Sequence, residues 1–346
     1  MVEAARLRAE IEADPNRRLG RRLIDRLRAQ TTHAATVFTL SPDRTTLCPN
    51  ATSGAAALIA SLPLGPADTV VVLDTEYASI IRAWEIACAK TSAQLIQIPV
   101  PLPFTGTEQL LADLDDRVPG PVSYLQISLI TSSAAIRLPV HELSEWVHRR
   151  GGRLILDAAH GPGHIPLTPD IWGAAAVFGT VHKWLPAQRS VGFLSLAPDL
   201  VDHVRPAEVS LTWDSGDLIE RFSWPGTFDP VPRLALHTAI DQWAAWRADG
   251  LLDSCTTLAE TATDLLTTTG ARPTAAGDHL PPRLRAFLLD DVTVPEVKSA
   301  LRLTGVRAWV GPGPAGECLL RVAVHIYNDL ADLETLAGRI QEVLPR

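Results

Sequence analysis

Residues 154–185 read LILDAAHGPGHIPLTPDIWGAAAVFGTVHKWL, and this stretch decides the expected fold. Its two short apolar runs, residues 154–156 and 174–178, are typical of strands that are buried on both faces of a parallel sheet. The first run ends at Asp157, and the second leads into a polar turn that carries Lys183. If the two strands are neighbours, the carboxylate and the amine point from the strand ends toward one cleft.

An acid and a lysine in such a cleft suit pyridoxal 5'-phosphate (PLP). A lysine amine forms a Schiff base with the cofactor aldehyde, and a carboxylate keeps the pyridine nitrogen protonated, so that the ring accepts electrons. Lysine is rarely buried unless it is paired or reactive. We therefore expect Lys183 to be the catalytic residue and Asp157 the partner of the ring nitrogen. A structural acid with satisfied hydrogen bonds is the alternative for Asp157.

The motifs Asp157-Ala-Ala-His160 and His182-Lys183-Trp184-Leu185 resemble those of class V aminotransferase-like, fold-type I PLP enzymes, and most closely the isopenicillin N epimerase-like subgroup. The resemblance extends over most of the chain. It implies an α/β fold in which a mostly parallel sheet is sandwiched by helices and joined to a smaller C-terminal α+β domain. It also implies that His160 lies beside the cofactor ring or its phenolic oxygen, and that Thr180 and His182 bind its phosphate.

Apolar periodicity along the chain favours the same architecture, because strand-like and helical stretches alternate and ligands then bind beyond the strand ends. Strands are expected at residues 45–48, 70–73, 93–99, 122–126, 153–157, 174–178, 192–196, 283–289, 306–310 and 318–324. Helices are expected at residues 3–12, 16–31, 56–62, 78–90, 108–115, 140–150, 232–247, 251–269, 294–303 and 330–344. We divide the chain into an N-terminal helical arm (1–32), a large PLP-binding domain (33–235) and a small C-terminal domain (236–346).

Two further segments are candidates for cofactor contacts. Hydroxyl residues in Pro49-Asn50-Ala51-Thr52-Ser53-Gly54 open an Ala-rich helix, whose free N–H groups favour an anion. An ordinary N-cap is the alternative, and the resemblance assigns Thr52 and Ser53 to the phosphate. The resemblance also sets Tyr77 against the cofactor ring, where a half-buried tyrosine at a helix start is the alternative.

The segment Phe222-Ser-Trp-Pro-Gly226-Thr227-Phe-Asp229 is similar to a family Trp-x-Gly-Thr-x-Asp pattern. In the family this Gly-Thr reaches the phosphate of the partner subunit, which implies a homodimer with shared active sites. An ordinary Pro-Gly turn is the alternative for Gly226 and Thr227.

The substrate side of the site is expected near Arg321. The resemblance gives this arginine the substrate α-carboxylate, which a planar guanidinium can hold through two hydrogen bonds. Arg307 is a weaker second candidate. The loop at residues 308–317 has no cysteine, and Cys318 falls inside the expected strand, so persulfide chemistry is not expected. Leu129 stands where the family has a histidine, so the family's substrate does not transfer directly.

Composition limits the other possibilities. The net charge of −8 and the lack of a Lys/Arg-rich block disfavour nucleic acid and anionic membranes as partners. No apolar signal segment or membrane span is visible, and the four cysteines are scattered, which indicates a cytoplasmic protein with free thiols. A metal site from Asp157, His160 and His164 is set aside, because Gly161-Pro162-Gly163 cannot continue a helix.

Elimination of a β-leaving group needs one base and an electron sink, whereas epimerisation needs a second acid on the opposite face. We therefore expect a small amino-acid substrate and β-elimination from an S-substituted cysteine. Epimerase or racemase, aminotransferase and decarboxylating activities remain open, as does a catalytically silent PLP-binding interaction protein.

Overall fold

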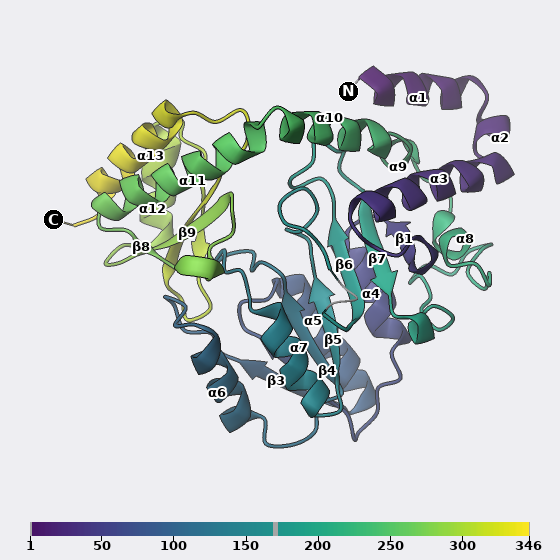
Figure 1. The fold of residues 1–346 in the computed structure, drawn as a ribbon, viewed down its shortest axis with the longest axis horizontal. Helices are drawn as coiled ribbons and strands as arrows, with labels where there is room; N and C mark the ends of the chain where they lie inside the picture. The colour runs from purple at the N-terminus through teal and green to yellow at the C-terminus, as the bar shows by residue number, and fades with distance from the viewer. Residues whose placement is uncertain (1, 169–171, 346) are drawn as a thin grey trace.

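The structure is a computed structural model that describes residues 2–168 and 172–345. A large sheet, covered by helices, and a smaller sheet domain lie side by side (Figure 1). The strands of the large sheet occur in the order β1-β7-β6-β5-β4-β2-β3. Their bounds are β1 Thr45–Cys48, β2 Thr69–Leu73, β3 Gln94–Ile98, β4 Tyr124–Ser128, β5 Arg153–Asp157, β6 Ala174–Thr180 and β7 Gly192–Leu196. From β6 through β3 all neighbours are parallel, and β7 runs antiparallel to both β1 and β6.

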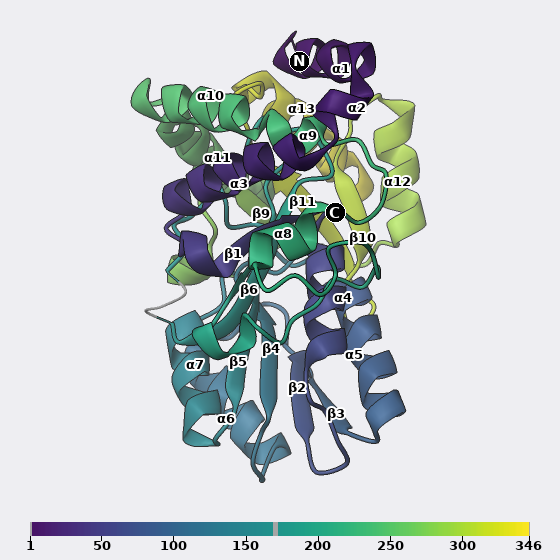
Figure 2. The same cartoon turned by 90° about the vertical axis from the view of Figure 1, so that its right-hand side faces the viewer.

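Helices cover both faces of this sheet, as the run of short apolar strands predicted. The helices around it are α4 Ala51–Ser61, α5 Ala78–Thr91, α6 Thr107–Arg117, α7 Val140–Arg149 and α8 Leu218–Ser223. In β2, Val71 packs in the core with α6 and α7, while Val70 and Val72 pack with α4 and α5. The two pairs of helices lie on opposite sides of the strands (Figure 2). Each buried branched side chain stabilises the fold by roughly 1.5–3 kcal/mol.

The same alternation places the polar strand ends together. Ser128 is the register partner of Asp157, and Asp157 is the partner of Phe178 on the next strand. Ile155 and Phe178 pack on the α4 and α5 side of the sheet. Since side chains alternate in direction along a strand, Asp157 faces that side as well, as does Thr180.

The smaller domain is built on an antiparallel sheet with the order β10-β11-β9-β8. Its elements are α11 Leu251–Thr268, β8 Arg272–Pro273, β9 Leu284–Leu289, α12 Val294–Leu303, β10 Trp309–Pro312, β11 Cys318–Ala323 and α13 Leu330–Val343. Apolar residues of α11, α12 and α13 pack against the sheet in a separate core. Helix α10 (Leu236–Ala248) joins the two parts, and its Leu236 and Ile240 belong to the core of the large domain.

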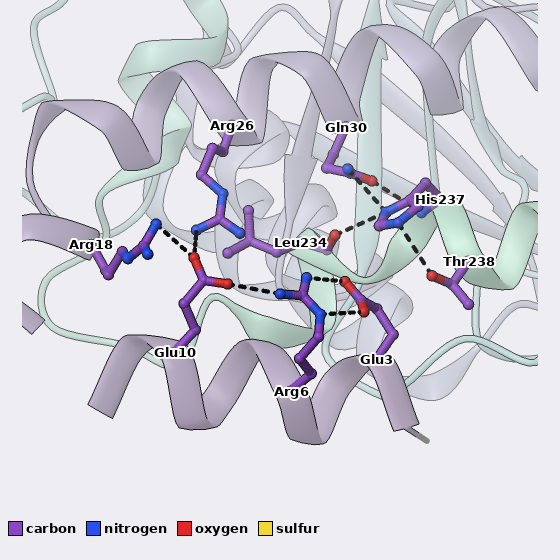
Figure 3. A network of polar contacts seen from close by, with 9 residues as sticks. All are labelled: Glu3, Arg6, Glu10, Arg18, Arg26, Gln30, Leu234, His237 and Thr238. Carbon is purple, nitrogen blue, oxygen red and sulfur yellow. Dashed lines mark hydrogen bonds and ion pairs between the residues drawn. The ribbon is translucent and has the colours of Figure 1, made fainter. Parts of the chain in front are cut away.

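The N-terminal arm consists of α1 (Val2–Ala13), α2 (Pro15–Arg18) and α3 (Arg21–Val37). Leu7 and Ile11 of α1 pack with Leu23 and Leu27 of α3 and with Leu234. Charged residues of the arm also pair with one another: Glu10 lies between Arg18 and Arg26, and Arg6 bridges Glu3 and Glu10 (Figure 3). Such partly exposed ion pairs stabilise by about 0–1 kcal/mol each, so the apolar contact holds the arm in place.

Several element boundaries differ from the prediction. The expected helix at 232–247 is two helices, α9 (Val231–Leu234) and α10, and the expected strand at 306–310 begins three residues later as β10. Strand β4 extends to Ser128, and β6 extends to Thr180. Helix α8 and strand β8 were not predicted. Among the described residues, no helix has the length and apolar character that crossing a membrane requires.

Candidate active site

A cavity of about 740 Å³ lies at the carboxyl ends of the strands, with walls from both the large and the small domain. Eight of the residues proposed from the sequence line it: Thr52, Tyr77, Asp157, His160, Thr180, His182, Lys183 and Arg321. These residues come from segments up to 269 positions apart in the sequence. It is therefore the fold that brings them together at one cavity.

Lys183 lies in the turn after β6 and is open to the interior of the cavity. Its Nζ is 3.0 Å from Nε2 of His160, a ring with only 7% of its surface exposed. The protein around the cavity displaces water and lowers the pKa of Lys183; Asp157 opposes this and Arg321 adds to it. Burial, together with Lys183, Arg321 and His164, holds the pKa of His160 well below its ordinary value.

Asp157 ends β5 with 5% of its surface exposed. Its Oδ1 accepts the backbone N–H of Ala159 at 2.7 Å, and no residue in the described part of the chain donates a hydrogen bond to Oδ2. Burial raises the pKa of Asp157, while the Ala159 N–H and Lys183 act in the opposite direction. A buried carboxylate oxygen that faces the cavity without a donor is suited to a cationic N–H of a bound group.

A second carboxyl, Glu76, lies in the same wall and was not assigned a role from the sequence. It follows β2, and its oxygens accept the backbone N–H of Ser128 at 2.7 Å and the Ser128 hydroxyl at 2.6 Å. Burial is the main cause that raises the pKa of Glu76 to about 8, and the charge of Asp157 contributes. Glu76 is therefore mostly a neutral acid at pH 7. The rule that ligands bind at strand ends could have identified it, since it follows a strand as Asp157 does.

The start of α4 forms one end of the cavity. Asn50 caps the helix by accepting the backbone N–H of Ser53 at 2.9 Å, and Thr52 lines the cavity. Ser53 lies outside this cavity, with its hydroxyl 3.3 Å from the Asn50 side chain. Opposite the helix start, the Thr180 hydroxyl contacts Nδ1 of His182 at 2.7 Å and the Val191 carbonyl at 3.0 Å.

The small domain contributes Arg321, on β11, to the wall of the cavity. Its guanidinium donates to the Ser132 carbonyl at 2.5 Å and lies 4.8 Å from the ring centre of Trp309. Burial lowers the pKa of Arg321, which remains a cation because guanidinium pKa values are so high. Ser132 and Trp309 also line the cavity, although neither was assigned a role from the sequence. Arg307 is exposed before β10 and does not line it.

The other candidates are either exposed at the cavity wall or lie away from the cavity. Tyr77 precedes α5 at the cavity wall with 50% of its surface exposed. Gly226, at φ +112°, and the exposed Thr227 form a turn that is not part of this cavity. All four cysteines are buried, and none of them lines the cavity. His164 stacks on Trp184 at 3.9 Å and bonds to backbone atoms of His160 and Arg283.

The comparison with protein families decides the identity of this arrangement. A model of the family described as "Aminotransferase class-V" matches residues 15–336. The chain belongs to this family. Both the expected family and the expected fold-type I architecture are confirmed. The family is one of PLP enzymes, which also confirms the expected cofactor.

Individual relatives of this class-V chain differ in activity. It is similar to isopenicillin N epimerase of Amycolatopsis lactamdurans, with 28% identity over 365 aligned residues that cover 97% of this chain and 90% of that protein. It is 27% identical over 183 residues to putative L-cysteine desulfhydrase 1 of Oryza sativa subsp. japonica, covering 50% of this chain and 38% of that protein. The structure of the cystine C-S lyase C-DES with its product cysteine persulfide has a TM-score of 0.84 at 20% identity, covering 99% of this chain and 93% of that one.

The polar groups in the cavity fit PLP. The unpartnered oxygen of Asp157, the open amine of Lys183 and the free N–H groups at the start of α4 are three different chemical groups at one site. They match a protonated ring nitrogen, an aldehyde and a phosphate, respectively.

Proposed function

We propose that this class-V enzyme is a C–S lyase that removes a thiol from an S-substituted cysteine by β-elimination. The observation that carries the proposal is the composition of the cavity: it holds one amine, Lys183, and no cysteine from the described residues. Desulfuration through an enzyme persulfide needs a nucleophilic thiol at the site. Elimination needs only a base that reaches Cα and an electron sink.

In this proposal the cavity walls hold the cofactor from three sides. Asp157 would pair with the ring nitrogen and Tyr77 would cover the ring, while His160 lies beside the reactive lysine. Thr52, His182 and the N–H groups at the start of α4 would hold the phosphate, while Thr180 positions His182 through its hydroxyl. When bound, PLP supplies the electron sink at the substrate carbon.

The residues of this chain then act on the substrate in a fixed order. Arg321 binds the α-carboxylate and orients Cα toward Lys183, whose free amine removes the Cα proton. The electron pair of the C–H bond forms the Cα=Cβ bond as the Cβ–S bond breaks, and sulfur leaves with its pair and takes a proton as a thiol. Addition of one water gives pyruvate and ammonia, so the reaction needs no oxidant.

Epimerisation at Cα is the second candidate. The identity of 28% with isopenicillin N epimerase over nearly the whole chain favours it. It requires a proton to arrive on the face of Cα opposite Lys183. Tyr77 at the cavity wall is the acid that the sequence offers, and a tyrosine that lies flat on the ring is poorly directed at Cα.

The exposed turn with Gly226 and Thr227 supports a homodimer with shared sites. Both residues lie outside the cavity of their own chain, which suits a role at the phosphate of a partner chain.

A substrate panel with two product assays distinguishes these activities. Protein saturated with PLP is incubated with L-cysteine, L-cystine, S-alkyl cysteines and non-sulfur amino acids in D₂O. We expect thiol and pyruvate in equal amounts from S-substituted cysteines, and none with Lys183→Ala. D-amino acid formed without thiol would instead establish epimerisation and overturn the lyase proposal, whereas deuterium in the recovered L-substrate alone would show only reversible removal of the Cα proton. Borohydride reduction should label Lys183; a label on Lys90 or Lys298 would contradict the site.

A further inference from the structure

The hydrogen bonds around His160 determine where its proton lies. The indole Nε1 of Trp184 is 3.3 Å from Nδ1 of His160, and an indole N–H can only donate. Nδ1 must therefore carry a lone pair. A neutral imidazole with an unprotonated Nδ1 has its proton on Nε2.

That proton points at the reactive lysine. Nε2 of His160 is 3.0 Å from Nζ of Lys183. An ammonium group has three donors and no acceptor, so it cannot receive a hydrogen bond from Nε2–H. The contact is satisfied only when Lys183 is a free amine whose lone pair accepts the imidazole proton.

Trp184 is itself held in place on several sides. It is 3% exposed, His164 stacks on its ring at 3.9 Å, and the Arg283 guanidinium lies 4.9 Å from the ring centre. His164 has a fixed tautomer as well: its Nε2 accepts the backbone N–H of Arg283 at 3.0 Å, so Nδ1–H donates to the His160 carbonyl at 3.1 Å. The indole donor therefore keeps one direction.

We propose that Trp184 is a positioning residue that fixes the tautomer of His160 and thereby keeps Lys183 as a free amine. The free amine is the form that bonds to an aldehyde carbon and the form that removes a proton. This inference rests on Lys183 as the reactive lysine in the proposed function, and it is independent of the choice between elimination and epimerisation.

The other charged groups around the pair act in both directions. Asp157 at the end of β5 favours the ammonium form of Lys183, whereas Arg321 on β11 disfavours it. His164 and Arg321 both disfavour a charged His160. His182, on the other side of Lys183, has a pKa lowered mainly by burial and also by Lys183. The hydrogen bond from Trp184 adds a directional contribution that none of these charges supplies.

The first measurement uses the wild-type protein without cofactor. Long-range ¹H–¹⁵N NMR of protein labelled with ¹⁵N-histidine distinguishes protonated from unprotonated ring nitrogens, and His160→Gln assigns the His160 signals by their loss. We expect an unprotonated Nδ1 and a protonated Nε2 from pH 6 to 8. A proton on Nδ1, or a doubly protonated ring at pH 7, would overturn the proposal without any variant of Trp184.

The second measurement follows the addition of PLP to cofactor-free protein by absorbance between pH 6 and pH 10. Trp184→Phe keeps the aromatic packing but removes the donor. Its midpoint should shift upward by about one pH unit, with roughly tenfold slower addition at pH 7. Trp146→Phe is the matched control, because it removes a buried indole donor to Asp115 away from the cavity. Equal midpoints for wild type and a folded Trp184→Phe would refute the role.

These results separate the inference from the proposed function. A substrate panel that yields no thiol would remove the lyase proposal and leave the tautomer of His160 as measured. A wrong tautomer would remove the role of Trp184 and leave the products of the reaction as measured.

Discussion

Replacement of the buried acid Glu76 by glutamine should make the protein more stable at high pH. Glu76 has 5% of its surface exposed, and its pKa is raised from 4.5 to about 8, chiefly by burial. Between these two pH values the folded state binds a proton that the unfolded state has released. Stability therefore falls as pH rises through this interval. The cost of Glu76 is on the order of 3 kcal/mol at pH 7 and about 5 kcal/mol at pH 9.

Glutamine resembles the protonated acid and does not ionise. Its carbonyl can accept the Ser128 N–H and its amide can donate to the Ser128 hydroxyl, so both contacts seen for Glu76 have a counterpart. Urea unfolding of cofactor-free protein at pH 5, 7 and 9 measures the effect. Wild type and Glu76→Gln should be similar at pH 5 and diverge as pH rises. The exposed Glu108→Gln controls for the lost charge. A gap that is constant across pH would refute the reasoning.

Three further predictions concern the site. Asp157→Asn should lower turnover on the order of a hundredfold, because a charge-assisted contact to the ring is lost, while PLP occupancy by absorbance changes much less; near-normal turnover would make Asp157 structural. Arg321→Lys should raise KM about tenfold or more and alter kcat less, since lysine lacks the planar fork; an unchanged KM would contradict carboxylate binding. Mixed Lys183→Ala and Thr227→Ala chains under subunit exchange should regain about a quarter of wild-type activity, and a mixture no more active than its components would exclude the shared site.

The sequence was most informative where local pattern and burial coincide. The apolar run before Asp157 predicted β5 with the bounds that the structure gives, and the same holds for β1 and β7. These strands are short and, apart from the partly exposed Arg153 at the start of β5, buried, so the residues in them must be apolar or paired. The motifs around Asp157 and Lys183 likewise led to the family. The resemblance depends on these residues, and they lie together at the carboxyl ends of β5 and β6.

The sequence was less informative where tertiary contacts decide the outcome. Glu76 reads as an ordinary acid before a helix, and its raised pKa depends on burial by the surrounding fold, which the hydrogen bonds from Ser128, 52 positions away, only partly offset. Trp184 reads as an apolar residue after the lysine, and its role depends on His160 from the end of another strand. The boundary of β10 also moved, because its pairing with β11 determines where the strand begins.

Taken together, the contacts explain how so many ionisable groups share one cavity. Burial keeps Glu76 protonated near pH 7, and the direction of the Trp184 donor keeps His160 neutral, which in turn favours a neutral Lys183. Arg321 on β11 remains a cation in the wall that the small domain contributes. Asp157 lines the cavity from the carboxyl end of β5. In the proposed function, a substrate held between them would have the Arg321 cation at its carboxylate, and Asp157 would lie at the ring nitrogen of the bound cofactor. A ring nitrogen kept protonated by Asp157 would make the bound cofactor the acceptor for the electrons of the Cα–H bond, as both elimination and epimerisation require.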